Sequence, residues 1–123
     1  MKKLKILYVE DDSINIYVMK RFLKIDFEIE VSVDGEEAIE VLKSNTFDLI
    51  LMDINLGNGK MDGIEVMNHL RHEMGIKVPV FAITSFAMAG DEEKFLKEGF
   101  DDYISKPVEK ETIINKIKDY FKL

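Results

Sequence analysis

Acidic, hydroxyl and basic side chains lie at the carboxyl ends of several short apolar runs in this sequence. Asp11 and Asp12 follow the run LKILYV, and Asp53 ends the run DLILMD. Thr84 ends VPVFAIT, and Lys106 follows DDYIS. Carboxylates suit a hard divalent cation and can act as nucleophiles, whereas a lysine and a hydroxyl suit a phosphoryl group. Together these five residues have the chemistry of a phosphoryl-transfer site in which Asp53 is the nucleophile.

Each of these residues also has an ordinary structural interpretation. An aspartate in the position of Asp12, at the start of a predicted helix, commonly caps that helix. Asp53 could accept hydrogen bonds from the amides of its own loop, Thr84 could be a plain strand residue, and Lys106 could be a solvated turn residue. The combination favours the functional interpretation, because crowded carboxylates repel one another unless a cation lies among them.

Short apolar runs alternate with longer amphipathic segments along the whole chain. The predicted strands are residues 4–9, 29–33, 48–53, 78–84 and 101–105, and the predicted helices are about 13–26, 35–44, 62–74, 88–98 and 109–122. This alternation predicts an α/β fold with a doubly wound, five-stranded parallel sheet and helices on both faces. Ligands bind at the carboxyl ends of the strands of such a sheet, so the candidate residues should lie on one rim. In the last helix Ile113, Ile117 and Tyr120 recur at helical spacing and should face the sheet.

Composition limits the classes of function. A chain of 123 residues suits one domain, and we expect a single domain over residues 1–123 with no effector domain. The net charge of -7 argues against direct nucleic-acid binding, and the absence of cysteine excludes disulfides and thiolate metal sites. No apolar stretch approaches the ~20 residues that span a bilayer, which predicts a cytoplasmic protein without membrane insertion.

The acidic pair after the first strand, LMDIN, ITS and DDYISKP together resemble the receiver domain of two-component response regulators. The resemblance covers essentially the whole chain, and the motifs occur in the family's order. It implies a flavodoxin-like fold with strand order 2-1-3-4-5. It also implies that Asp53 is the phosphoacceptor and that Asp11 and Asp12 hold Mg2+, or alternatively Mn2+, together with Asp53 and the backbone carbonyl of Asn55.

The same resemblance assigns the remaining site residues. Thr84 is the switch hydroxyl, Tyr103 the switch aromatic and Lys106 the partner of the phosphoryl group, and a cis peptide bond precedes Pro107. The implied function is a signalling switch that accepts a phosphoryl group on Asp53 from a histidine kinase or a histidine phosphotransfer protein. Such a receiver catalyses its own phosphorylation and dephosphorylation without being an enzyme in the usual sense. Its output surface is the fourth helix, fifth strand and fifth helix, and its downstream target is unknown.

Other interpretations fit the sequence less well. A non-phosphorylated interaction module of the same fold would be favoured by loss of the acceptor, the lysine or the acidic pair, and all are present. A flavin-binding domain would need a Ser/Thr/Gly-rich loop after the first strand, where EDDS would repel a phosphate, and GNGK does not match a G-x-x-x-x-G-K-[ST] phosphate loop. His69 and His72 lack a third ligand nearby and are predicted to lie on a surface face.

The sequence departs from the family pattern after the acceptor. Gly57 replaces the usual proline, and two extra residues precede Asp62. A glycine-rich loop of this kind is predicted to be more mobile than the family's usual loop.

Overall fold

The computed structural model describes residues 3–56, 61–85 and 91–123. The predicted mobile loop at residues 57–60 and the start of the predicted helix 88–98 therefore lie outside the described residues.

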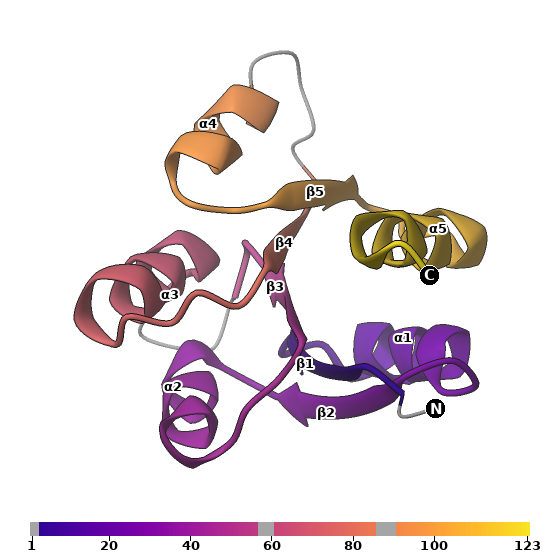
Figure 1. Cartoon of the computed structure of the whole chain (residues 1–123), viewed down its shortest axis with the longest axis horizontal. Coiled ribbons are helices and arrows are strands. Elements are labelled where there is room, and N and C mark those ends of the chain that lie inside the picture. The colour runs from indigo at the N-terminus through magenta and orange to yellow at the C-terminus, as the bar shows by residue number, and fades with distance from the viewer. Residues whose placement is uncertain (1–2, 57–60, 86–90) are drawn as a thin grey trace.

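The described residues alternate strand and helix from one end to the other (Figure 1). The strands are β1 (Lys5–Val9), β2 (Glu28–Ser32), β3 (Leu49–Asp53), β4 (Val80–Thr84) and β5 (Asp102–Ser105). The helices are α1 (Ser13–Leu23), α2 (Gly35–Ser44), α3 (Gly63–Asn68), α4 (Asp91–Lys97) and α5 (Lys110–Phe121). The predicted elements are confirmed, with ends that differ by a few residues.

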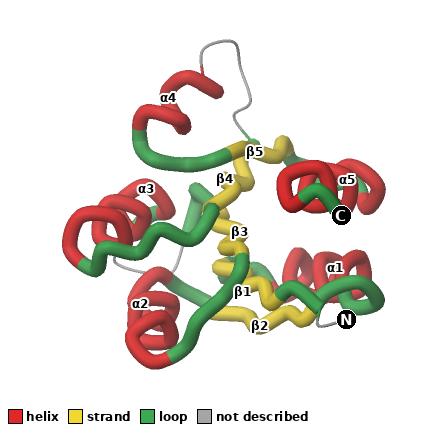
Figure 2. Tube along the Cα trace, viewed as in Figure 1, coloured by secondary structure: helices red, strands yellow, loops and turns green. Residues whose placement is uncertain are grey.

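The sheet is parallel throughout, in the order β2-β1-β3-β4-β5, which confirms the predicted fold class. Helices α1 and α5 cover one face of the sheet, and α2 and α3 cover the other (Figure 2). Strands β3 and β4 are buried along their whole length, because helices cover both of their faces. No helix among the described residues combines the length and apolarity needed to cross a membrane.

The core is divided by the sheet into two hydrophobic clusters. Ile113 and Ile117 of α5 are fully buried in the cluster beneath α1 and α5, as predicted. Tyr120, predicted on the same face, remains 42% exposed because it lies in the last turn of α5. Its ring still contacts Phe81 edge to face, with centroids 5.4 Å apart.

The predicted helix 62–74 changes its geometry part-way. Residues His69–Glu73 form a π-helical segment that directly follows α3. Arg71 in this segment donates hydrogen bonds of 2.8 Å to the carbonyls of Ile76 and Val78, and its guanidinium pairs with Asp101 at 3.1 Å. The π-helical segment thus connects α3 to the residues that precede β4 and β5. These residues lie at the end of the sheet opposite the carboxyl ends of the strands.

Candidate functional site

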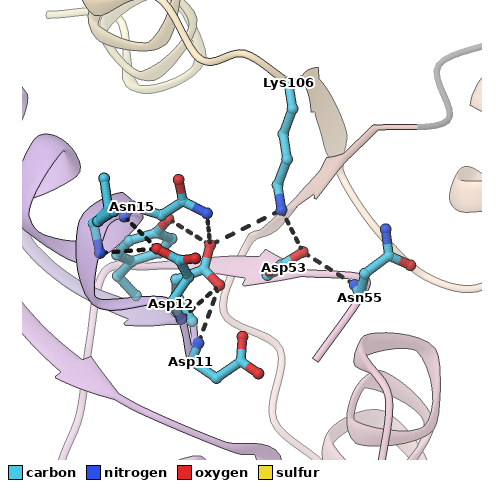
Figure 3. A network of polar contacts seen from close by, with 9 residues as sticks. Asp11, Asp12, Asn15, Asp53, Asn55 and Lys106 are labelled. Carbon is cyan, nitrogen blue, oxygen red and sulfur yellow. Dashed lines mark hydrogen bonds and ion pairs between the residues drawn. The ribbon is translucent and has the colours of Figure 1, made fainter. Parts of the chain in front are cut away.

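The register of the sheet places the candidate residues side by side. Val9 lies opposite Met52, Asp53 opposite Ile83, and Thr84 opposite Ser105. The residues that end β3 and β4, and those that follow β1 and β5, therefore share one rim. Figure 3 shows Lys106 reaching across this rim to Asp53, with Asp11 and Asn15 on the side of β1.

Asp53 is the last residue of β3 and is only 1% exposed. Its Oδ1 accepts a hydrogen bond from the Lys106 ammonium at 3.1 Å and another from the backbone N–H of Asn55 at 3.0 Å. The ordinary structural interpretation of Asp53 is therefore confirmed, since the carboxylate accepts from an amide of its own loop, and the same oxygen also contacts the lysine.

A glycine allows α3 to begin directly against the backbone at the end of β3. The N–H of Gly63 donates to the carbonyl of Ile54 at 3.1 Å. A Cβ atom on Gly63 would lie 2.5 Å from the carbonyl oxygen of Asp53 and 2.8 Å from the Cα of Ile54, which are distances that real Cβ atoms do not adopt. Asp62 caps α3 through a capping box with Glu65. The backbone of Asp53 is thus held between β4 and the start of α3.

Glu10 is a site residue that the sequence analysis missed. It follows β1, extends the ladder by donating its N–H to the carbonyl of Ser32 at 2.9 Å, and is only 1% exposed. Its Oε2 accepts hydrogen bonds from the N–H groups of Asp11 and Asp12, at 3.0 and 3.3 Å. The Lys106 ammonium lies 4.0 Å from its Oε1.

The acidic cluster is made by Glu10, Asp11 and Asp53. Ligand oxygens of these three residues lie within 4.8 Å of one another, the only such group among the described residues. Asp12 lies outside the cluster, because its Oδ1 caps α1 by accepting hydrogen bonds from the N–H groups of Ile14 and Asn15, at 2.8 and 2.9 Å. The predicted acidic pair is therefore shifted by one residue, to Glu10 and Asp11.

Burial and crowding change the acid–base properties of this site. The pKa of the Glu10 carboxyl is raised from 4.5 to about 7, mainly by burial and also by the hydrogen bond and charge of Asp53, while the Asp12 amide and Lys106 oppose the shift. Burial also raises the pKa of the Tyr8 hydroxyl well above its ordinary value, assisted by the charge of Glu10. Tyr8 consequently keeps its proton and acts as a hydrogen-bond donor.

The donor set fits a divalent cation. Three carboxylates face one lysine at a rim where two of the carboxylates are almost completely buried, so negative charge is in excess. Mg2+ prefers hard oxygen ligands and commonly uses one or two carboxylates plus waters. A cation would relieve the repulsion that raises the pKa of Glu10.

The two predicted switch residues occupy different positions. Thr84 is fully buried at the end of β4, where its carbonyl accepts a hydrogen bond from the N–H of Lys106 at 2.9 Å. Tyr103 lies on β5 opposite Ala82, half-buried, with the Lys116 ammonium 5.6 Å from its ring centroid. Thr84 thus lies at the rim next to Lys106. Tyr103 lies two residues before the end of β5, farther from the rim.

The remaining predictions concern local geometry. The Lys106–Pro107 peptide bond is cis, as the family resemblance implied. His69 and His72 lie in the π-helical segment, where His69 pairs with Glu73 and neither histidine joins the acidic cluster.

Comparison with known proteins decides the family. The family model for the response regulator receiver domain matches residues 6–118 of this chain. The chain is a receiver domain. Its fold is also that of solved receiver domains: it superimposes on the receiver domain of the sensor histidine kinase PA1611 from Pseudomonas aeruginosa with a TM-score of 0.84, 29% identity and coverage of 98% of this chain and 99% of that one. That crystal structure is described with a magnesium ion coordinated in the active site cleft.

Curated relatives of this receiver domain include both hybrid kinases and separate regulators. It is 37% identical to the autoinducer 2 sensor kinase/phosphatase LuxQ of Vibrio vulnificus over 89% of this chain, which spans only 13% of LuxQ. It is 35% identical to the polar-differentiation response regulator DivK of Brucella anthropi, over 94% of each chain. Receiver domains similar to this one therefore occur in both contexts.

Proposed function

We propose that this receiver domain is a phosphorylatable signalling switch, in which Asp53 accepts a phosphoryl group from a histidine kinase or a histidine phosphotransfer protein. The observation that carries the proposal is the environment of Asp53. This buried carboxylate lies 3.1 Å from the Lys106 ammonium and shares a cluster of ligand oxygens with Glu10 and Asp11. The alternative, a non-phosphorylated interaction module, gives no reason to bury acids around a lysine.

In the transfer step, a carboxylate oxygen of Asp53 attacks the phosphorus atom of the donor. A new O–P bond forms, the P–N bond to the donor imidazole breaks, and the imidazole nitrogen keeps the electron pair. The nucleophile needs no general base when it is ionised. The Lys106 ammonium, already beside Asp53, is positioned to bind the oxygens of the transferred group. Hydrolysis then breaks the same O–P bond by attack of water on phosphorus and restores the carboxylate.

A divalent cation fits this scheme. Glu10, Asp11 and Asp53 would hold Mg2+ or Mn2+ together with the backbone carbonyl of Asn55. When bound, such a cation neutralises charge that develops on the phosphoryl oxygens.

The output step of the proposal uses Thr84 and Tyr103. An aspartyl phosphate adds negative charge and acceptor oxygens at the rim. The hydroxyl of Thr84 would move toward these oxygens and Tyr103 would turn inward, which alters the surface formed by α4, β5 and α5 and biases an existing equilibrium between two states. The position of Thr84 at the end of β4, next to β3 and Asp53 in the sheet, supports this coupling. The proposal includes a cytoplasmic location, a single receiver unit over residues 1–123, and no direct contact with nucleic acid.

The test uses a small phosphodonor. With MgCl2 and acetyl phosphate, the wild-type chain should gain the mass of one phosphoryl group, and hydroxylamine should remove it. Asp53→Asn should gain none. Asp48→Asn is the matched control, since Asp48 accepts a hydrogen bond from the N–H of Lys5 at the opposite end of the sheet.

Equal labelling of Asp53→Asn and wild type would refute Asp53 as the nucleophile. A folded wild-type chain that gains no mass with any small phosphodonor would favour the non-phosphorylated interaction module.

A further inference from the structure

The Glu10 carboxylate is held by two kinds of donor. Its Oε2 accepts from backbone N–H groups, which any residues at positions 11 and 12 would supply. Its Oε1 accepts from two side chains, the Tyr8 hydroxyl at 3.1 Å and the Asn15 amide at 3.2 Å. The orientation of Oε1 therefore depends on the identities of Tyr8 and Asn15.

Both side-chain donors are fixed by the fold. Tyr8 lies in β1 and is 2% exposed, with its ring packed in the hydrophobic cluster beneath α1 and α5. Asn15 lies in the first turn of α1, whose start is set by the Asp12 cap. A donor held by core packing and a donor held by a capped helix meet at the same oxygen.

Packing of the core does not require the hydroxyl group of Tyr8. A phenylalanine would fill the same apolar space without placing a polar group in the core, and a buried hydroxyl costs free energy unless it is hydrogen-bonded. The hydrogen bond to Glu10 offsets that cost. Glutamate also carries one more methylene than aspartate, so its carboxylate has an extra torsion to fix before it can act as a ligand.

We propose that Tyr8 and Asn15 are positioning residues that hold the Glu10 carboxylate in the orientation needed to bind the divalent cation. The inference rests on the proposed function, in which Glu10 is a cation ligand. Hydrogen-bonding partners of metal ligands commonly orient them and tune their affinity. The pair acts through Glu10 and does not itself contact the cation or the phosphoryl group.

The first experiment measures binding of MnCl2 to the phosphate-free chain by electron paramagnetic resonance, with calorimetric titration of MgCl2 beside it. Tyr8→Phe should weaken Mn2+ binding about tenfold, and Asn15→Ala should have an effect in the same direction. Tyr17→Phe is the matched control, because the Tyr17 hydroxyl bonds Arg21 on the exposed side of α1 and its loss should leave the Kd unchanged.

A double-mutant cycle tests whether the hydroxyl acts through Glu10. Glu10→Asp shortens the side chain and withdraws the carboxylate from Tyr8, so Tyr8→Phe should have no further effect on the Mn2+ Kd in that background. An equal loss of affinity in both backgrounds would overturn the inference. So would a wild-type Kd in Tyr8→Phe, whatever its melting temperature, because a packing role alone moves stability and not affinity. Failure of the wild-type chain itself to bind Mn2+ would instead overturn the proposed cation site.

Discussion

The stability of the metal-free domain should fall as pH rises, and Glu10 should be the cause. Its pKa is raised from 4.5 to about 7 in the folded state, first by burial and then by Asp53. Between these two values the folded state binds more protons than the unfolded state, so the free energy of unfolding decreases with increasing pH. At 1.36 kcal/mol for each unit of pKa, the contribution of Glu10 to the free energy of unfolding that is lost by pH 8 is on the order of 3 kcal/mol. The titration belongs to the Glu10–Asp53 pair as a whole.

The assay compares wild type with Glu10→Gln in EDTA at pH 5 and pH 8. The melting temperature of both proteins is compared at the two pH values. From pH 5 to pH 8 the wild-type melting temperature should fall by on the order of 10 °C more than that of Glu10→Gln, because the variant lacks the titrating carboxyl. Glutamine fills the same space, and its amide oxygen can accept from the Tyr8 hydroxyl; its amide nitrogen then faces the N–H groups of Asp11 and Asp12, a cost that does not depend on pH. MgCl2 at pH 8 should restore much of the wild-type loss by binding the folded state, while NaCl at matched ionic strength should not. Equal pH dependence in both proteins would refute the assignment of this charge to Glu10.

Three further changes separate the roles of neighbouring residues. Lys106→Ala should remain folded but be labelled by acetyl phosphate on the order of 100-fold more slowly, because the charge beside Asp53 is lost; unchanged labelling would make Lys106 a surface charge. Asp12→Ala should lower the free energy of unfolding by about 1 kcal/mol through loss of the α1 cap, with Mn2+ affinity unchanged, and a large loss of affinity would return Asp12 to the ligand set. Gly63→Ala should cost roughly 1–3 kcal/mol in urea unfolding, since its Cβ meets the backbone of Asp53 and Ile54; a wild-type midpoint would show that this backbone can shift.

The fold could be predicted because the periodicity of the sequence is regular. Buried runs such as LILM and capped amphipathic helices specify a parallel sheet, and the observed strand order follows the family resemblance. The π-helical segment His69–Glu73 could not be predicted, since its residues continue an ordinary helical pattern. Its geometry accompanies contacts of Arg71 with the carbonyls of Ile76 and Gly99, and Gly99 is 28 residues away in the sequence.

The meeting of Asp53, Thr84 and Lys106 at one rim could be predicted from the sequence, whereas the members of the acidic cluster could not. Three consecutive acids follow β1, and sequence adjacency alone does not show which two face Asp53. The capping preference of Asp12 was the informative signal, because an aspartate that caps α1 leaves Glu10 and Asp11 to form the cluster. The contact between Tyr8 and Glu10 could not be found from the sequence, where a tyrosine in an apolar strand indicates only core packing.

The residue that carries the phosphoryl group can be identified chemically. After reaction with acetyl phosphate, borohydride reduces an aspartyl phosphate to homoserine, and peptide mass spectrometry identifies the converted residue. We expect homoserine at position 53 in the presence of MgCl2 and little or none in EDTA. Homoserine at position 11 or 12, or equal conversion of Asp53 with and without the cation, would contradict this expectation.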